Sequence, residues 1–198
     1  MRLDTQTDAM LPRSAARQDS CAVQIGTVAR NGRCSYLPLL TDMVGHTAMR
    51  QRLGDERGRD VLREHEAITR EVLKAHAGTE VKTMGDGFMA SFGSVTKAVE
   101  CAVALQRAFA ERNSSAHPEA LEGLSVRVGL NAGEPIEEDG DLFGATVILA
   151  SRVAAKADGG EILVADTVRG LYSGKSFLFA DRASSSRRGS RSRFGCTR

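Results

Sequence analysis

The sequence predicts an α+β fold, in which a mixed and mainly antiparallel sheet carries helices packed on one face. Two kinds of segment lead to this prediction. Short apolar or alternating runs bounded by Gly, Asp or Ser are typical of strands. Longer runs with an apolar residue every three or four positions are typical of amphipathic helices. The predicted order is strand, two helices, two strands, helix, two strands, helix, strand and helix, and hairpins mixed with helices in this way favour an α+β sheet.

The first predicted strand follows an irregular leader, residues 1–34, in which no periodicity is sustained. The apolar run 36–40 predicts a buried strand ending at Thr41-Asp42, although Pro38 lacks the N–H that a central strand needs. Residues 47–76 have helical spacing. We expect Gly54 and Gly58 to break this stretch into two helices, and Gly78 to act as its C-terminal stop.

A hairpin is predicted next, with strands at 80–83 and 88–92 around a turn at 84–87 that holds two glycines and an aspartate. Ser94 is expected to cap the following helix, whose apolar face repeats at helical spacing and contains Val95, Val99, Ala102 and Phe109. Two strands are expected next, at 124–130 and near 134–138, followed by a loop that opens at Gly140-Asp141. A helix is expected at 145–157, a strand at 162–164, and a short helix that Asp166 caps and that ends at Tyr172.

Composition excludes several classes of protein. The 198 residues suffice for one domain with a core, and Lys+Arg 27 nearly balances Asp+Glu 25, which argues against a surface built for nucleic acid. No apolar run is long enough to span a bilayer, and the N-terminus has no signal-peptide core. The four cysteines form no CxxC pair, so we expect a reduced, cytoplasmic protein with no membrane partner and Cys101 as core filling.

Two aspartates stand out by position. Asp42 ends a predicted buried strand, and Asp86 lies at the tip of the predicted hairpin. If the two strands are neighbours, both carboxylates can lie on the same edge of the sheet, where they would suit a hard divalent cation such as Mg²⁺. An aspartate in a turn also commonly bonds its own backbone, so for Asp86 this plainer interpretation stays open.

Five ordered segments support a more specific interpretation. Residues 40–47 (LTDMVGHT) and 81–88 (VKTMGDGF) resemble the signature segments of class III adenylyl/guanylyl cyclase catalytic domains. Three further segments agree with that family in order and spacing: 126–134 (VRVGLNAGE), 141–152 (DLFG to ASR) and 160–164 (GEILV). The resemblance covers about residues 36–182, which predicts a cyclase domain at 35–182.

The resemblance implies a ferredoxin-like cyclase fold and a head-to-tail homodimer with shared active sites. In such a site one chain supplies the metal ligands, which match Asp42, Asp86 and the backbone carbonyl of Met43. Two Mg²⁺ or Mn²⁺ ions per site are implied.

The other chain supplies a base-reading pair, which matches Lys82 and Asp141, and an arginine for the phosphates in the transition state, which matches Arg152. Arg127 matches a further phosphate-contacting arginine. Adenine offers an acceptor at N1 and a donor at N6, so a Lys donor and an Asp acceptor fit it, whereas guanine has the opposite polarity there. ATP is therefore the expected substrate. Two plainer interpretations stay open: Lys82 could be merely an exposed strand residue, and Arg152 could be an ordinary surface residue of a helix.

The sequence departs from the family pattern at two places. Ile148 stands where these cyclases usually carry an asparagine, four residues before Arg152, and losing such a donor typically costs roughly 10²–10³ in rate. Residues 183–198 form a Ser/Arg-rich run, predicted to be disordered, where the family continues into a strand pair bearing a phosphate-binding lysine. We hypothesise that the reading frame was lost near residue 182 or that the gene is truncated.

Three functions are therefore compared. The leading prediction is an adenylate cyclase that converts ATP to cyclic AMP and pyrophosphate in intracellular signalling. The alternative favoured by Ile148 and the altered C-terminus is a catalytically weak cyclase-fold module that binds ATP and regulates a partner. The least supported function is nucleic-acid binding by the arginines of 183–198. Such binding usually needs aromatic residues between the basic ones to stack on bases, and Phe194 is the only aromatic residue in this run.

Overall fold

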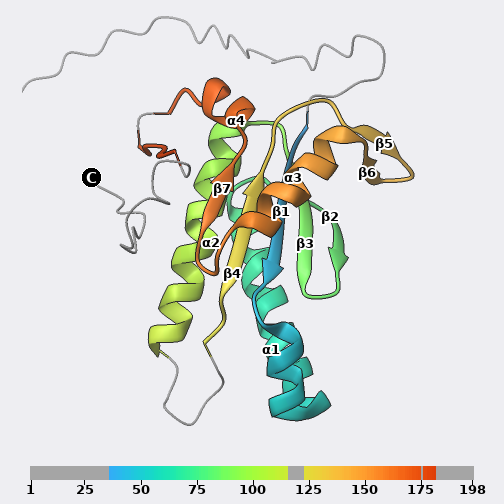
Figure 1. The fold of residues 1–198 in the computed structure, drawn as a ribbon, viewed down its shortest axis with the longest axis vertical. Coiled ribbons are helices and arrows are strands. Elements are labelled where there is room, and N and C mark those ends of the chain that lie inside the picture. Colours follow the sequence, from blue (N-terminus) through green and yellow to red (C-terminus); the bar gives the residue numbers. More distant parts are fainter. Residues whose placement is uncertain (1–35, 116–122, 175, 182–198) are drawn as a thin grey trace, which may run out of the picture.

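The computed structural model describes residues 36–115, 123–174 and 176–181. The predicted leader 1–34 and the Ser/Arg-rich run 183–198, together with the hypothesis about its origin, lie outside the described residues. A five-stranded sheet has the order β2-β3-β1-β4-β7, and β5 and β6 form a separate two-stranded hairpin (Figure 1). The pairings β1–β3, β1–β4 and β2–β3 are antiparallel and β4–β7 is parallel, which confirms the predicted mixed and mainly antiparallel α+β sheet.

The described elements follow the predicted order, and the two expected N-terminal helices are joined across a kink at Gly54 and together labelled α1. The strands are β1 (Leu37–Met43), β2 (Thr79–Met84), β3 (Gly87–Phe92), β4 (Val126–Leu130), β5 (Ile136–Glu138), β6 (Asp141–Phe143) and β7 (Ile162–Val164). The helices are α1 (His46–Ala75), α2 (Val95–Ser115), α3 (Ala145–Lys156) and α4 (Asp166–Leu171). Every helix in the described part of the chain is either too short or too polar to cross a membrane.

The helices cover both faces of the sheet, so the prediction of helices on one face was wrong. On one face, α1 and α2 close a large core with alternate residues of β1, β3 and β4, among them Leu39, Phe88 and Val128. On the other face, α3 packs on β1, β4 and β7, as Figure 1 shows. A second and smaller apolar cluster forms there, and includes Leu40 and Met89. The strand segments are too apolar on both sides for a sheet with one solvated face.

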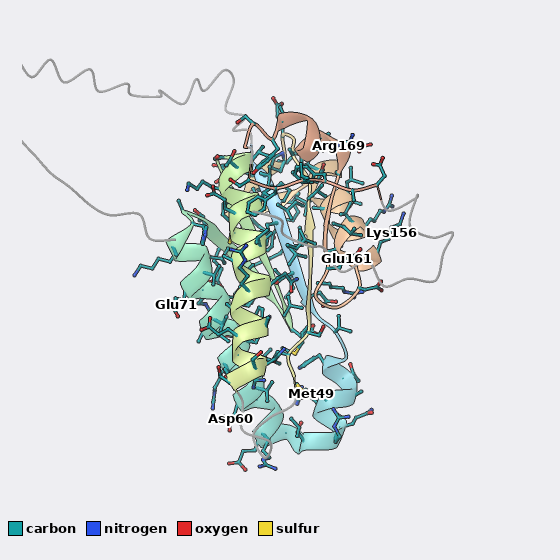
Figure 2. All side chains as sticks on the ribbon, turned by 90° about the vertical axis from the view of Figure 1, so that its left-hand side faces the viewer. Met49, Asp60, Glu71, Lys156, Glu161 and Arg169 are labelled. Atoms are coloured by element: carbon teal, nitrogen blue, oxygen red, sulfur yellow. The ribbon has the colours of Figure 1, made fainter. Side chains whose placement is uncertain are left out.

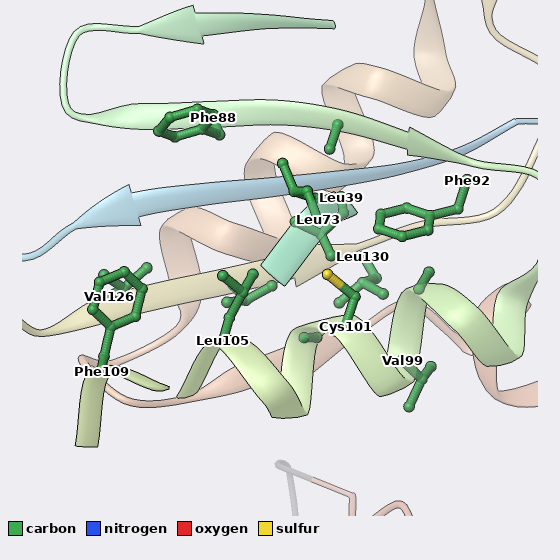
Figure 3. Close-up of a cluster of buried hydrophobic side chains, with 14 of the residues drawn as sticks. Leu39, Leu73, Phe88, Phe92, Val99, Cys101, Leu105, Phe109, Val126 and Leu130 are labelled. Carbon is green, nitrogen blue, oxygen red and sulfur yellow. The ribbon is translucent and has the colours of Figure 1, made fainter. Parts of the chain in front are cut away.

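The main core is aliphatic with a few aromatic rings. Phe88, Phe92 and Phe109 are at most 2% exposed, and Leu105 and Cys101 of α2 lie against them (Figure 3). Burial raises the pKa of the Cys101 thiol to about 12, so the group stays protonated and serves as core filling, as the sequence predicted. Charged residues of α1 such as Asp60 and Glu71 point away from the molecule (Figure 2).

Pro38 is buried in β1 even though β1 is the central strand of the sheet. Its carbonyl accepts from the Asn131 N–H (3.3 Å), so the proline nitrogen faces the same side, next to β4. The pairing of β1 with β4 begins one residue later, at Leu39 and Leu130. The missing N–H therefore falls at the end of a ladder, where the loss of a hydrogen bond is tolerated.

Only one of the two predicted helix breaks occurs in α1. Gly54 takes φ 79° and ψ 173° and kinks the helix, whereas Gly58 stays helical and buried because Arg50 packs where its side chain would be. At the C-terminus Ala77, not a glycine, takes the left-handed conformation (φ 56°). Gly78 is needed for a different reason, since a Cβ there would lie 2.5 Å from the Phe92 ring.

The turn between β2 and β3 is tighter than predicted. Gly85 and Asp86 form a two-residue connection between the paired residues Met84 and Gly87. Gly85 has φ 68° and Asp86 has a negative φ, as in a type II′ hairpin. Gly87 lies directly against the backbone carbonyl of Thr41, so any side chain there would clash with β1. This close approach brings Asp86 beside the end of β1.

Two smaller predictions also need correction. Asp141 begins β6, which pairs with β5, so it does not open a loop as predicted. The turn of that hairpin lies at Asp139 and Gly140, which both have positive φ. Asp166 lies in the first turn of α4, and Ala165 occupies the capping position without a side-chain hydrogen bond.

Candidate active site

The predicted site residues on the central sheet share the face covered by α3. Successive side chains of a strand point to opposite faces. Asp42 therefore lies on the same face as Leu40, which belongs to the apolar cluster beneath α3. Arg127 is opposite Asp42 in the β1–β4 register, and Lys82 is opposite Met89 in the β2–β3 register. The opposite face is closed by the main core, so the chemistry is confined to the α3 face.

Asp42 is paired with Arg127, which the sequence had assigned to phosphate contact alone. The Nε of Arg127 donates to Asp42 Oδ2 at 2.7 Å, and Nη2 donates to the same oxygen. The remaining Nη1 donates to the backbone carbonyl of Ala155 in the last turn of α3 (3.2 Å). Both side chains are about one third exposed. Arg127 thus connects the candidate metal carboxylate to the C-terminal end of α3.

Asp86 lies beside the end of β1, as the hairpin geometry requires. Its neighbour Gly87 is paired with Asp42 in the β1–β3 register, so the two carboxylates lie at adjoining positions. The Nδ1 of His46 lies 3.3 Å from Asp86 Oδ2. His46 is the first residue of α1, and its Nε2 is buried without a hydrogen-bond partner among the described residues. His46 stands within the signature segment 40–47, but its sequence context alone does not mark it as a site residue.

The donor set fits a hard divalent cation. Two carboxylates at adjoining strand ends, each about a quarter to a third exposed, offer the oxygen ligands that Mg²⁺ and Mn²⁺ prefer. No group of three or more His, Cys, Asp or Glu capable of holding a metal occurs in residues 36–115, 123–174 and 176–181. The protein side would therefore supply few ligands. The predicted ligand role of the Met43 carbonyl, at the end of β1, stays a prediction.

Lys82 and Asp141 come together from elements 59 positions apart in sequence. Lys82 Nζ donates to Asp141 Oδ2 at 2.5 Å, and the Leu142 N–H donates to Asp141 Oδ1 at 2.7 Å. The hydrogen bond from Lys82 holds the pKa of Asp141 below its ordinary value, against a smaller opposing effect of desolvation. Lys82 Nζ also lies over the Phe143 ring, 5.6 Å from its centroid. The donor and the acceptor of the predicted base-reading pair are thus side by side.

Arg152 and Ile148 lie one turn apart on α3, and both are exposed. Ile148 is 52% exposed, so the expected asparagine position presents an apolar side chain to solvent. Arg152 makes none of the hydrogen bonds or ion pairs found within the described residues. Its position is therefore set by the helix and not by a partner side chain.

The start of α1 adds a feature that sequence reasoning missed. The first intrahelical bond runs from Met49 N to Gly45 O, so the preceding N–H groups of the first turn are left for another acceptor. Gly45 takes φ 77° at the helix start. The first turn follows directly on Asp42 and is in contact with Asp86 through His46. The N-terminus of a helix favours negative charge, so this turn could bind an anion. The sequence signal that could have predicted this helix start is Gly45, which follows the strand-ending Asp42.

A cavity lies away from the predicted site residues. A space of about 510 Å³ lies between α2, β7 and residues 176–181, and includes Phe177 and Phe179 in its walls. It contains none of the predicted site residues.

Comparison with known proteins identifies the family of this chain. Residues 37–195 match the model of the adenylate and guanylate cyclase catalytic domain. The chain belongs to this family. The matched range continues past residue 182, and the predicted boundary at that position stays a prediction.

Two curated relatives of this chain are named as adenylate cyclases. A putative adenylate cyclase 3 of Rhizobium meliloti is 36% identical over 140 residues, which cover 70% of this chain and 23% of that protein. An adenylate cyclase of Podospora anserina is 35% identical over 127 residues, covering 54% of this chain and 6% of that protein. The chain therefore spans about a quarter or less of the length of these two relatives.

Solved structures agree on the fold. The guanylyl cyclase Cya2 superposes with a TM-score of 0.66 at 27% identity, covering 74% of this chain and 81% of that chain. An adenylate/guanylate cyclase/hydrolase from Silicibacter pomeroyi superposes with a TM-score of 0.58 at 32% identity, covering 70% of this chain and 79% of that chain. The chain is thus a nucleotide cyclase domain with a class III fold, and the family by itself does not decide between adenine and guanine.

Proposed function

We propose that this domain is an adenylate cyclase that converts ATP to 3′,5′-cyclic AMP and pyrophosphate, with active sites shared between two copies of the chain. The observation that carries the choice of ATP is the contact between Lys82 and Asp141 (2.5 Å). A charged donor and a charged acceptor held side by side match the N1 acceptor and the N6 donor of adenine. Guanine in the same place would leave the lysine donor and the aspartate acceptor without matching partners, and a mismatch in a site built for hydrogen bonds can cost roughly 10⁴ in specificity.

Each residue then has a defined part in the reaction. Asp42 and Asp86 would hold divalent cations, which lower the pKa of the ribose 3′-hydroxyl and neutralise the triphosphate when bound. Lys82 and Asp141 orient the base, so that the 3′-oxygen lies in line with the α-phosphorus. Arg152 stabilises the charge that develops on the phosphorus.

Arg127 has two possible anionic partners in this scheme, the phosphates and Asp42. Its guanidinium donates to Asp42, and a triphosphate would compete for the same group. Binding of nucleotide would thereby free one carboxylate oxygen for a cation. Nucleotide and metal should therefore bind more tightly together than separately.

Exposed apolar side chains beside the base-reading pair support a homodimer. Ile136 and Phe143 are paired in the β5–β6 hairpin and are 63% and 45% exposed, and Leu149 of α3 is 43% exposed. Such side chains in one region are typical of a surface that is buried in an assembly. A second copy placed there would bring its own aspartates toward Lys82 and Arg152, as the shared site of the proposal requires.

The test is cyclic nucleotide formation from ATP and from GTP, with Mn²⁺, at several protein concentrations. We expect cAMP as the main product, with a rate that rises faster than linearly with protein, because the site needs two chains. Bound ATP without product would favour the second candidate, a regulatory ATP-binding module. The exposed Ile148 is the observation that supports this alternative.

Base selection has a sharper test in a charge-exchanged variant, Lys82→Glu with Asp141→Lys. The ion pair is retained, so the fold of the hairpin should be kept, while the polarity offered to the base is reversed. The ratio of cGMP to cAMP should rise by roughly 10²-fold or more. The matched control exchanges a pair on α1 outside the site, Arg63→Asp with Asp60→Arg, which should leave that ratio unchanged. An unchanged ratio in the first variant would remove the role of the pair in base selection.

A further inference from the structure

Asn131 is a buried amide at the end of β4 that the reaction scheme above does not use. Its side chain lies on the α3 face of the sheet and the residue is only 3% exposed. Buried amides are costly unless their donors and acceptors are satisfied. The partners of Asn131 therefore identify what the residue holds in place.

Both polar atoms of the Asn131 side chain have partners, and the partners lie on different helices. Nδ2 donates to the backbone carbonyl of Thr146, in the first turn of α3 (2.9 Å). Oδ1 accepts from the hydroxyl of Thr167, in the first turn of α4 (2.8 Å). The amide orientation follows from chemistry, because a backbone carbonyl can only accept. One side chain thus joins the end of β4 to the starts of two helices.

At its other end α3 is held in two ways. Gly129 of β4 has no side chain and lies against the backbone of Ala154, so helix and strand are in direct contact there. Arg127 Nη1 donates to the Ala155 carbonyl at 3.2 Å. Arg127 also binds Asp42 and is the candidate phosphate contact, so its hold on α3 changes when substrate or metal binds. Asn131 touches none of these groups, so its hold does not change.

We propose that Asn131 is a positioning residue for Arg152, and that it acts by fixing the start of α3 on the sheet. The proposal rests on the proposed function, since Arg152 is taken to act in the transition state. Arg152 has no side-chain partner within the described residues, so the helix alone sets where its guanidinium lies. Displacement of a catalytic group by about 1 Å can cost roughly 10² in rate.

The first experiment compares Asn131→Asp with Thr167→Val. The aspartate keeps the acceptor for Thr167 and loses the donor to Thr146. The valine removes the α4 hydroxyl that bonds Asn131 Oδ1 and the Ala132 N–H, and keeps the bond from Asn131 to α3. We expect Asn131→Asp to lower kcat by roughly 10- to 100-fold with KM for ATP within about twofold, because Arg152 acts mainly in the transition state. Thr167→Val should change kcat by less than about twofold. A rise in KM at unchanged kcat, or equal effects of the two variants, would overturn the proposal.

A double-mutant cycle tests whether Asn131 acts through Arg152. In an Arg152→Ala background, Asn131→Asp should lower kcat by less than about twofold further. If the two losses multiply, Asn131 acts elsewhere and the proposal is wrong. Should Asn131→Asp not fold, Asn131→Leu removes the same donor without burying a charge and takes its place in the cycle, with Thr167→Val accounting for the lost acceptor.

Hydrogen exchange gives a readout that needs no activity. Amides of residues 145–150 should exchange faster in Asn131→Asp than in wild type or in Thr167→Val. Unchanged exchange in this segment overturns the proposal, whether or not the protein makes cAMP. Wild-type protein that makes no cyclic nucleotide contradicts the proposed function, and the exchange experiment then decides separately whether Asn131 fixes α3.

Discussion

The two faces of the central sheet differ in what the same strands contribute to each. On the α1/α2 face, alternate residues such as Leu39, Phe88 and Val128 are at most 1% exposed and pack into one continuous core. On the α3 face, the positions between them carry Asp42 and Arg127. Strand alternation therefore divides these segments into a half that builds the core and a half that carries the candidate site. Substitutions on the two faces should separate loss of stability from loss of activity.

The largest effect is expected from removing a carboxylate on the α3 face. Asp86→Ala should lower cAMP formation by roughly 10³-fold or more, because cation binding supplies several kcal/mol of transition-state stabilisation. The urea midpoint of unfolding should change little, since Asp86 is partly exposed at a hairpin tip. Asp60→Ala, an exposed change on α1, is the matched control. A variant that keeps its activity would show that the carboxylate is a turn residue only.

The opposite face contains one group that should make stability depend on pH. His65 is fully buried between Phe88 and Phe109, and neither ring nitrogen has a partner within the described residues. Desolvation lowers the pKa of His65 from 6.5 to about 4. The unfolded chain thus binds a proton below pH 6.5 that the folded chain does not bind until about pH 4. The free energy of unfolding should fall by about 3 kcal/mol across that interval.

The variant His65→Leu should remove this pH dependence, because leucine fills a similar volume without titrating. Urea unfolding of both proteins between pH 7 and pH 4 measures the difference in slope. Other histidines and carboxylates contribute equally to both proteins, so the comparison isolates His65. Parallel curves for the two proteins would mean that the buried ring is protonated normally.

Restoring the expected donor on α3 should raise activity without a change in stability. Ile148→Asn places an amide one turn before Arg152, at a position that is 52% exposed. A single transition-state donor is typically worth roughly 10²-fold in kcat, and the melting temperature should stay the same because little packing is lost. Ser151→Asn, an exposed change on the same helix, is the control. No increase with Ile148→Asn would show that another group already supplies the contact, and an equal increase with Ser151→Asn would show that the gain does not depend on the position of the amide.

The smallest effect is expected from an ion pair that joins α1 to α2, away from the chemistry. Arg112 donates to both carboxylate oxygens of Glu64, at 3.1 and 2.7 Å, and is only 10% exposed. Arg112→Met should lower the free energy of unfolding by about 1 kcal/mol and leave kcat and KM unchanged. Denaturant unfolding together with the cAMP assay checks both parts. A loss of activity at unchanged stability would contradict the separation of the two faces.

Local patterns predicted most of the elements, because helical and strand periodicity are properties of neighbouring residues. They failed where a distant contact decided the outcome. Gly58 looks like a helix breaker, but Arg50 packs over it and the helix continues. Asp141 looks like the start of a loop, but pairing with β5 makes it a strand. Pro38 looks unsuited to a central strand, but its nitrogen faces the end of a ladder.

The sequence by itself determined which residues are available for chemistry and in what order the elements occur. Six candidate site residues stand in segments that could be recognised without a structure: Asp42, Lys82, Asp86, Arg127, Asp141 and Arg152. Only the tertiary structure decided their partners. Lys82 meets Asp141 across 59 positions and Arg127 meets Asp42 across 85. Such pairings depend on strand register and on which face a helix covers, and these are set by packing of the whole domain and not by any local pattern.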